Sequence, residues 1–213
     1  MTWRPDVPWL EYDEIRRRAD VFLRRANAHE IIPVNIELII EQMAIDIVPL
    51  PGLRENFDTD GWLTPDETTI YIDEWEADHR TNRARFTLAH EVGHRELHSS
   101  LLREVRTVIQ TISEWQAFVG NLPDDVRSQF EFQANCFAGL VLVPGNHLSA
   151  AYDRVLPAVM KLVRKSLRKG ASKPLVLDFA LRALAERLAP SFEVSSEVML
   201  IRLEKERLSI PQT

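Results

Sequence analysis

The sequence predicts an α+β protein in which a short mixed or antiparallel sheet packs with several helices and an all-helical segment follows. Three observations carry this prediction. β-prone runs fall within the first 73 residues, helical periodicity dominates from Asn82 onward, and no strand pattern follows Ala150. We therefore expect two domains, residues 1–148 with the sheet and residues 149–213 built from helices alone.

The first two elements are expected to be helices. Residues 10–28 place apolar side chains at three- and four-residue steps, with arginines on the other faces, which is typical of an amphipathic helix. Asn35 then offers an N-cap for a short helix that uses Ile36, Ile39, Ile40 and Met43.

Strands are expected next. "IDIVPL", residues 45–50, is an apolar run bounded by proline and glycine. The runs Gly61–Thr64 and Thr68–Ile72 are separated by "PDE", which favours a turn, so they predict a hairpin. The second run can either pair with an extended peptide substrate or be an ordinary paired strand.

The remainder of the chain is expected to be helical. An apolar stripe predicts a helix over 101–119, either a lid over a cleft or a plain packing helix. "GNLPDD" breaks that pattern before a second predicted helix, 124–142, which "VPGN" ends. The last three predicted helices lie near 153–169, 174–188 and 196–207.

Composition excludes some classes of protein. The formal net charge is −6, so the whole molecule has no basic field for an extended polyanion. The N-terminus lacks the pattern of a secretory signal, and no apolar run approaches the roughly 20 residues that span a bilayer. The single cysteine agrees with a reducing compartment. We expect a cytoplasmic protein with no membrane partner.

The stretch "RFTLAHEVGHRELH", residues 85–98, contains the pattern H-E-x-x-H. Residues four apart in a helix project from one face, so His90 and His94 can bind one metal ion, and neutral imidazole nitrogen suits zinc. Glu91 lies beside that face and can act as a general base toward a water at the metal. The pattern is short, so a metal site needs a further ligand as support.

His98 does not supply this ligand in a straight helix, because it lies about 12 Å along the axis from His90 and about 80° around it. We expect His98 instead to be a residue at the end of the helix that is partly buried or in contact with solvent. Alternatively, it forms part of the wall of a cleft. The best third ligand is Glu131, with Asn135 one turn on and able to hold a histidine ring by its other nitrogen. By spacing alone, a solvated surface carboxylate explains Glu131 equally well.

Two motifs in this order, "RFTLAHEVGHRELH" and "EFQANCFAGLVLVP", resemble the ImmA/IrrE metallopeptidases, and the resemblance extends over residues 30–145. It implies a small thermolysin-like domain whose active-site helix carries H-E-x-x-H. The implied zinc ligands are His90, His94 and Glu131, with Glu91 as general base and Asn135 as an orienting residue. Thermolysin-like enzymes also use a cationic or hydroxyl donor for the oxyanion, and the candidates are Tyr71, His98 and His147.

Several members of that family cleave helix-turn-helix repressors, and some accompany toxin and antitoxin pairs. The resemblance thus implies a zinc metallo-endopeptidase that regulates gene expression by hydrolysing a co-encoded helix-turn-helix repressor or antitoxin. Two histidines and a carboxylate also accept manganese. Residues 149–213 resemble the helix-turn-helix-like segment that follows the peptidase domain in such proteins.

The alternative is a non-catalytic regulator that binds DNA or a protein partner and has a structural or vestigial metal site. It would act through the basic stretch "MKLVRKSLRKGASK", residues 160–173, whose cations can contact phosphates if they share one face. Such a run is more often a solvated face, so DNA contact is not the favoured interpretation.

Overall fold

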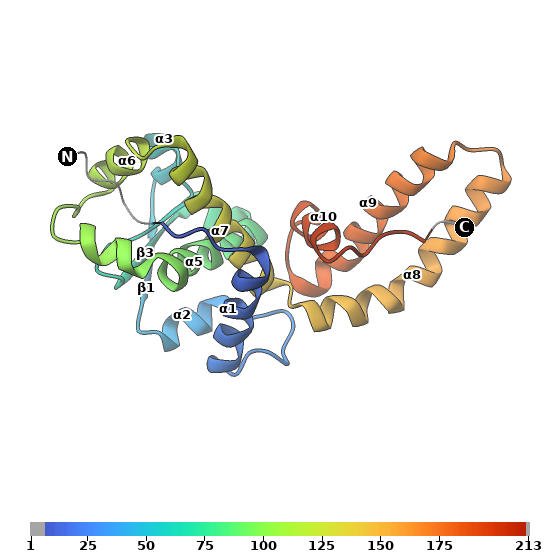
Figure 1. The fold of residues 1–213 in the computed structure, drawn as a ribbon, viewed down its shortest axis with the longest axis horizontal. Coiled ribbons are helices and arrows are strands. Elements are labelled where there is room, and N and C mark those ends of the chain that lie inside the picture. Colours follow the sequence, from blue (N-terminus) through green and yellow to red (C-terminus); the bar gives the residue numbers. More distant parts are fainter. Residues whose placement is uncertain (1–6, 212–213) are drawn as a thin grey trace. The chain divides into compact units, whose positions relative to one another are not determined.

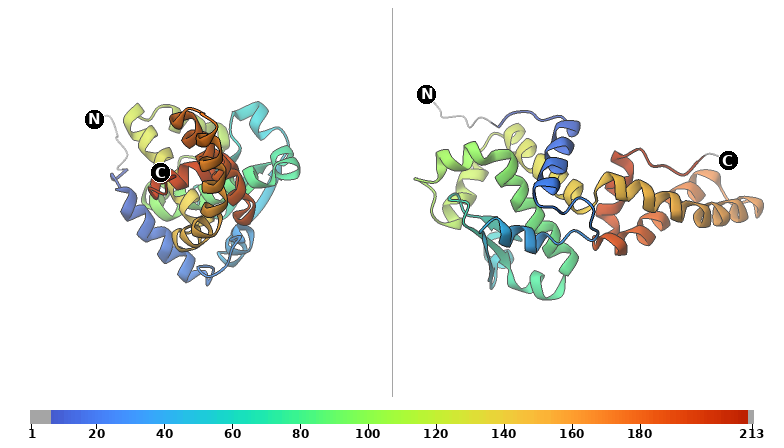
Figure 2. Two further views of the ribbon diagram at one scale, coloured as in Figure 1. Left: turned by 90° about the vertical axis from the view of Figure 1, so that its right-hand side faces the viewer. Right: turned by 90° about the horizontal axis from the view of Figure 1, so that it is seen from below.

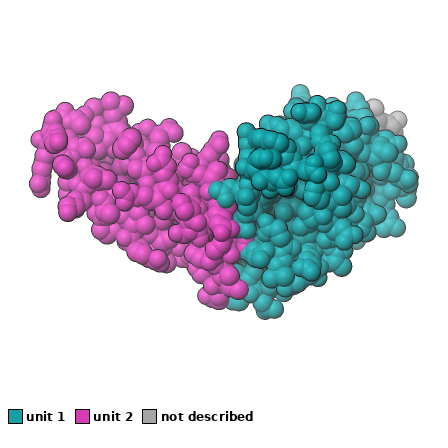
Figure 3. Space-filling model, turned by 180° about the vertical axis from the view of Figure 1, so that it is seen from behind, with its two compact units in different colours: residues 1–29, 35–141 teal, residues 30–34, 142–213 magenta. Residues whose placement is uncertain are grey.

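The computed structural model describes residues 7–211, which contain ten helices and three strands (Figure 1). The chain forms two compact units, coloured separately in Figure 3: unit 1 comprises residues 1–29 and 35–141, and unit 2 comprises residues 30–34 and 142–213. Within the described range, no helix is long and apolar enough to cross a membrane. The domain boundary expected after residue 148 stays a prediction.

The first two helices confirm the periodicity and the cap expected for them. Helix α1 (Tyr12–Arg25) buries one face made of Ile15, Ala19, Phe22 and Leu23. Helix α2 (Ile36–Gln42) begins after Asn35, whose side-chain oxygen accepts the N–H of Leu38 at 2.9 Å.

A mixed three-stranded sheet follows, with the strand order β1-β3-β2. Strand β1 (Asp46–Leu50) runs parallel to β3 (Thr69–Asp73), and β2 (Gly61–Leu63) pairs with β3 as the predicted antiparallel hairpin. Because β3 is the central strand, both of its edges are occupied. It is therefore an ordinary paired strand, and the suggestion that it binds an extended peptide is wrong.

Two short helices were not predicted, since five or six residues are too few to show a helical period. Helix α3 (Leu53–Phe57) lies between β1 and β2 in the sequence, helix α4 (Glu74–His79) follows β3, and both are held by one side chain. The carboxylate of Asp73 accepts the N–H of Arg54 with one oxygen and the N–H of Glu76 with the other. Asp73 thus caps α4 and ties α3 to the end of β3.

Helix α5 (Thr81–Val105) contains the H-E-x-x-H motif and bends at His98, where φ is −125° and ψ is 18°. The predicted helix 101–119 is wrong as one element. Its first turn belongs to α5, residues 106–111 leave the helix, and α6 (Ile112–Gly120) begins anew. The restart is a capping box, in which Thr111 and Glu114 satisfy each other's backbone N–H groups.

Helix α7 (Asp124–Leu142) has the predicted bounds. It packs with the last turns of α5 and with the loop before α6 in an apolar cluster of Leu101, Val105, Ile109 and Phe130. Val7, Trp115 and Phe118 lie against this cluster. The same helix also holds the start of the described chain, because Gln129 and Gln133 donate to the carbonyl oxygens of Val7 and Pro8.

Unit 2 consists mainly of three helices, α8 (Gly145–Arg168), α9 (Lys173–Phe192) and α10 (Ser196–Lys205). Helices α8 and α9 lie side by side as a hairpin, seen from two directions in Figures 1 and 2. The predicted start of α8 near residue 153 is wrong. Pro144 takes the N-cap with extended dihedral angles, so "VPGN" starts a helix as well as ending one.

Candidate metal centre

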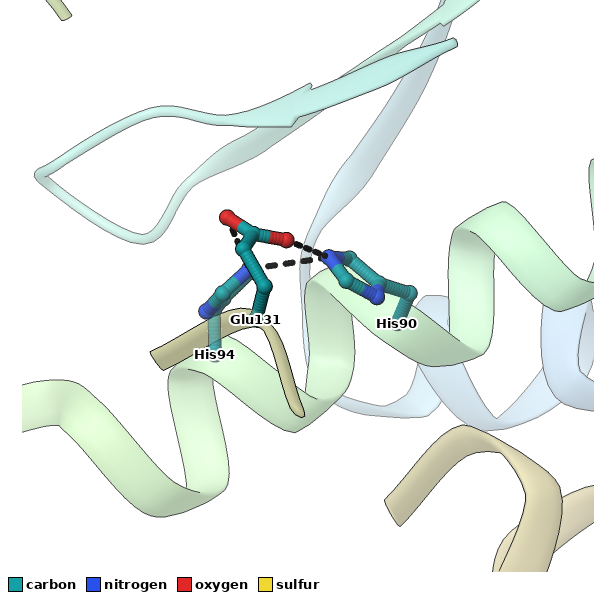
Figure 4. A group of neighbouring side chains, drawn as sticks. All are labelled: His90, His94 and Glu131. Carbon is teal, nitrogen blue, oxygen red and sulfur yellow. Dashed lines mark hydrogen bonds and ion pairs between the residues drawn. The ribbon is translucent and has the colours of Figure 1, made fainter. Parts of the chain in front are cut away.

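One face of helix α5 supplies most of the polar side chains of the candidate site. Arg83, Thr87, His90, Glu91 and His94 recur at steps of three, four and one residues, which places them along one stripe of the helix. Helix α5 lies against strand β2, and Glu131 of α7 lies beside His90 and His94 (Figure 4). The histidine pair therefore lies where two other elements can add donors to it.

Gly93 allows α7 to approach this face closely. A Cβ atom placed on Gly93 would lie 3.1 Å from the carbonyl oxygen of Ala134 and 3.3 Å from the ring of Phe137. Both distances are tighter than ordinary contacts, so the two backbones meet here only because residue 93 lacks a side chain. Periodicity along either helix alone does not reveal this contact, because it joins residues about 40 positions apart in the sequence. Ala134 lies three residues beyond Glu131 on α7, so the close approach carries that carboxylate toward the histidines.

The structure brings His90, His94 and Glu131 together, and their donor atoms lie within 4.8 Å of one another. The Nε2 atoms of the two histidines are 2.9 Å apart. The Glu131 carboxylate lies 3.3 Å from Nε2 of His90 and 4.0 Å from Nε2 of His94 (Figure 4). Two ligands at 2.0 Å from one tetrahedral ion are about 3.3 Å apart, so these separations suit a single small cation.

Asn135 gives a second reason why these donors fit a metal. Its side-chain oxygen lies 3.1 Å from Nδ1 of His90, so that nitrogen donates a proton and the lone pair of the ring is on Nε2. This lone pair faces a carboxylate and a second imidazole, an arrangement that needs a proton or a cation between them. Two imidazoles and one carboxylate beside an open cleft match the donor set of catalytic zinc, and manganese accepts the same set.

His98 is not part of this group of donors, but its environment differs from the expected one. The side chain is buried, with 2% of its surface exposed, so the interpretation as a partly exposed helix-end residue is wrong. Its Nδ1 lies 3.1 Å from Nδ1 of His94, and its Nε2 lies 3.0 Å from the side-chain oxygen of Gln133. The bend at His98 and the proximity of α7 account for the error, since neither is visible in the periodicity.

Glu91 extends from α5 toward strand β2 and is buried there. Its Oε2 accepts the backbone N–H of Leu63 at 2.9 Å. Gly61 makes this contact feasible, because a Cβ there would lie 2.5 Å from Thr87 and would push the strand away from the helix. Burial raises the pKa of Glu91 to about 7, while the His90 charge and the Leu63 N–H oppose the shift.

The two histidines differ in their affinity for protons. Burial alone would lower the pKa of His90, but the hydrogen bond with Glu131 and the charge of Glu91 outweigh it, and its pKa is raised. Burial lowers the pKa of His94 well below its ordinary value, and the neighbouring histidines add to the effect. His94 is thus neutral at pH 7, as a metal ligand must be.

A cleft of about 350 Å³ opens beside these groups. Besides His90, Glu91, Glu131 and Asn135, its lining includes Arg54, Asp60, Arg83 and Thr87. Asp60 binds both arginines, at 2.6 Å to Arg54 and 2.9 Å to Nε of Arg83. The sequence analysis did not identify these three residues. The position of Arg83, seven residues before His90 on one helix face, was the available signal, whereas Arg54 and Asp60 reach the cleft through tertiary structure.

The three candidate oxyanion donors are not brought into this cleft. Tyr71 stacks on Trp62, with ring centroids 5.6 Å apart, and is not among the lining residues. His98 is wrong as a donor, because both of its ring nitrogens face partners away from the cleft. His147 lies on α8 in unit 2.

Comparison with known proteins gives a family for this arrangement. The profile of the Peptidase_M78 family, described as the IrrE N-terminal-like domain, matches residues 40–204. No curated protein matches the chain. Among solved structures, a Mycobacterium tuberculosis transcriptional regulator is similar at 15% identity with a TM-score of 0.46, and the match covers 92% of this chain and 52% of that one. This chain therefore spans about half of the regulator's length.

The matched region includes both helices that supply the candidate metal donors, α5 and α7, and extends over most of the sequence. The chain belongs to the Peptidase_M78 family, whose profile describes the IrrE N-terminal-like domain.

Proposed function

We propose that this protein is a zinc-dependent metallo-endopeptidase that hydrolyses a peptide bond in a protein substrate. The observation that carries the proposal is the convergence of His90, His94 and Glu131 within 4.8 Å, beside the buried carboxylate of Glu91, in an open cleft. Two histidines four apart on one helix, with a carboxylate from another helix, form the ligand set of a thermolysin-type zinc site.

A zinc ion held by these three residues would supply Lewis acidity toward a water and toward the scissile carbonyl. The proton transfers belong to Glu91. Its Oε2 is fixed by the Leu63 N–H, so the carboxylate is held in one orientation, and Oε1 is the atom that accepts the proton from water. A pKa of about 7 lets the same group take that proton and then deliver it to the leaving amine.

Strand β2 is the element we assign to binding the substrate chain. It is an edge strand of the sheet, and its first residue, Gly61, lines the cleft. The Leu63 N–H on this edge already holds Glu91, so an extended peptide would pair with the other outward-facing main-chain groups of β2 and lie beside the cleft. This assignment replaces the earlier suggestion for β3.

The proposed substrate class is a helix-turn-helix repressor or antitoxin encoded beside this protein, as the family resemblance implies. The test uses such a repressor, purified and incubated with the zinc-loaded protein. We expect one or a few defined cleavage products in mass spectra, loss of cleavage after treatment with a chelator, and recovery when zinc is added. Cleavage that continues without metal would contradict the proposal.

The third ligand has its own test. Glu131→Ala removes a carboxylate that lies 3.3 Å from His90, and we expect the variant to lose both stoichiometric zinc and cleavage. Native mass spectrometry measures the zinc content of the folded protein. Glu104→Ala, an exposed glutamate near the end of α5, is the matched control and should retain both. If Glu131→Ala keeps its zinc, the assignment of the third ligand is wrong.

A second candidate function, binding of duplex DNA by unit 2, is favoured by one observation. Lys161, Arg164, Lys165 and Arg168 are all exposed at helical spacing on the last two turns of α8. If this face binds DNA, association with a duplex should weaken steeply with salt and should not respond to a chelator. Replacing these four cations with serine would then abolish binding without affecting cleavage of the repressor.

A further inference from the structure

The two histidines of the candidate metal centre are held in different ways. Nδ1 of His90 faces an amide oxygen, so a single contact decides where its proton lies. Nδ1 of His94 faces another imidazole nitrogen, Nδ1 of His98, at 3.1 Å. An imidazole nitrogen can donate or accept, so this contact alone does not determine which ring carries the proton.

Which of the two rings donates in the His94–His98 hydrogen bond is determined by the last acceptor of a hydrogen-bond chain that begins at His94. The carbonyl oxygen of Pro8 can only accept, and it lies 2.8 Å from the side-chain nitrogen of Gln133. The amide of Gln133 is thereby oriented with its oxygen toward Nε2 of His98, at 3.0 Å. That oxygen also only accepts, so the proton of neutral His98 lies on Nε2.

The next step follows from the two tautomers of imidazole. With its proton on Nε2, His98 presents a lone pair at Nδ1, so His94 must donate from its own Nδ1. The lone pair of His94 is then on Nε2, the atom 2.9 Å from Nε2 of His90 and 4.0 Å from Glu131. The Pro8 carbonyl thus determines, through two side chains, which nitrogen of His94 is free of a proton.

Burial makes it unfavourable to reverse the donors and acceptors of this hydrogen-bond chain. His94, His98 and Gln133 are 4%, 2% and 0% exposed, and the ring of Phe130 stacks on both histidines at 4.1 and 4.3 Å. If the amide of Gln133 turned around, its oxygen would face the Pro8 oxygen, and the buried amide oxygen would lack a donor. A buried polar group without a partner is destabilising.

We infer that His98 and Gln133 are positioning residues that, together with the Pro8 carbonyl, hold His94 in the tautomer whose Nε2 can bind the metal. The inference rests on the proposed role of His94 as a zinc ligand. It assigns His98 a function other than the three considered for it in the sequence: metal ligand, part of a cleft wall and oxyanion donor.

The direct test is the tautomeric state of the two rings in the unsubstituted protein. Long-range proton–nitrogen correlation spectra at pH 7.5 distinguish a ring protonated at Nδ1 from one protonated at Nε2. In the metal-free protein we expect His98 as the Nε2–H form and His94 as the Nδ1–H form, with both unchanged after zinc is added. A proton on Nδ1 of His98 would overturn the inference.

Zinc affinity gives a second test with a matched pair of variants. Gln129 lies one turn before Gln133 on α7 and donates to the neighbouring carbonyl, that of Val7, at 3.0 Å. Gln129→Leu therefore loosens the same segment without touching His98. Removing a partner of a metal-bound histidine typically weakens metal binding about 10- to 100-fold. We expect this loss for Gln133→Leu and His98→Phe, and less than about a threefold change for Gln129→Leu.

Competition with a chromophoric chelator measures the dissociation constant, and circular dichroism verifies that each variant is folded. Equal zinc affinity in Gln133→Leu and Gln129→Leu would overturn the inference. If Gln133→Leu does not fold, the tautomers of the unsubstituted protein decide alone. The two proposals can be contradicted separately. Absence of zinc binding in the unsubstituted protein contradicts the proposed function. The tautomers of the metal-free protein test the hydrogen-bond chain whether or not zinc binds.

Discussion

Units 1 and 2 differ in what they bury. Among the described residues, eight of the nine buried polar or charged side chains lie in unit 1, and the ninth, Arg202, lies in unit 2. Buried polar groups destabilise a fold unless each finds a partner. In unit 1 five of the eight are in the candidate site or its hydrogen-bond chain: Thr87, Glu91, His94, His98 and Gln133. Unit 1 therefore buries most of its interior polar groups at the candidate site, whereas unit 2 has an almost wholly apolar helical core among the described residues.

The largest expected effect tests the chemical side of this comparison. Glu91→Gln keeps the shape and the acceptor oxygen for the Leu63 N–H but cannot take a proton. We expect cleavage of the repressor to slow by about 10²- to 10⁴-fold, the usual contribution of general acid–base catalysis. Zinc content should be unchanged. Glu104→Gln on the same helix is the control. If Glu91→Gln cleaves the repressor at the normal rate, the assignment of Glu91 as the general base is wrong.

The same substitution should stabilise the metal-free protein at high pH. The pKa of Glu91 is raised from its ordinary value of 4.5 to about 7, so the folded chain favours the protonated form. The contribution of this group to stability is complete below about pH 4.5 and is lost as the pH rises through 7. A shift of about 2.5 units corresponds to about 3 kcal/mol.

Urea denaturation of chelator-treated protein at pH 5 and pH 8 measures this effect. The free energy of unfolding of Glu91→Gln relative to the unsubstituted protein should increase by about 3 kcal/mol between the two pH values. A difference that stays constant with pH would show that the buried carboxylate does not destabilise unit 1, and the contrast between the units would lose its main example.

Arg202 offers the corresponding test in unit 2. Its guanidinium donates to the carbonyl oxygen of Val143 at 3.0 Å and to Glu206 at 2.7 Å. Arg202→Met would leave a buried carbonyl without this donor, and we expect a loss of about 2 kcal/mol in thermal or urea unfolding. Arg182→Met, which removes an exposed pair with Asp178, should change stability by less than about 0.5 kcal/mol. A normal zinc affinity in Arg202→Met would show that this buried arginine stabilises unit 2 without affecting the candidate metal centre.

The smallest expected effect concerns the contact between α5 and α7. Gly93→Val adds atoms where even a Cβ would lie 3.1 Å from the Ala134 oxygen, so α7 must move away. We expect a loss of about 1 kcal/mol in stability together with weaker zinc binding. Gly120→Val is the control, since nothing lies within 4 Å of a Cβ at that position. Equal effects of the two substitutions would show that the close approach does not position Glu131.

The sequence was informative wherever one helix face carried the signal. The spacing of His90 and His94, the stripe of α1 and the bounds of α7 all follow from a period of 3.6 residues. It misled over residues 101–119, because the apolar stripe continues in register across the break. The capping-box residues Thr111 and Glu114 were the overlooked evidence for a new helix.

Tertiary contacts account for the rest. The partners of His98 are His94, on its own helix, and Gln133, 35 residues away. Gln133 in turn donates to the carbonyl oxygen of Pro8, 125 residues from it in the sequence. The periodicity of a helix or strand says nothing about contacts between residues so far apart in the sequence. For the same reason the cleft residues Arg54 and Asp60, on and after the unpredicted helix α3, were not identified.

The turn between α5 and α6 has a consequence for how this protein can diverge. Residues 106–111 separate the two histidines from Glu131 in the sequence, contribute no donor to the candidate metal centre, and expose Val108 to 70%. Exposed turns tolerate insertions better than packed helices do. Homologous chains can therefore vary in length here, and a recognition loop could be grafted at Val108, while the contact between Gly93 and Ala134 keeps the metal donors in place.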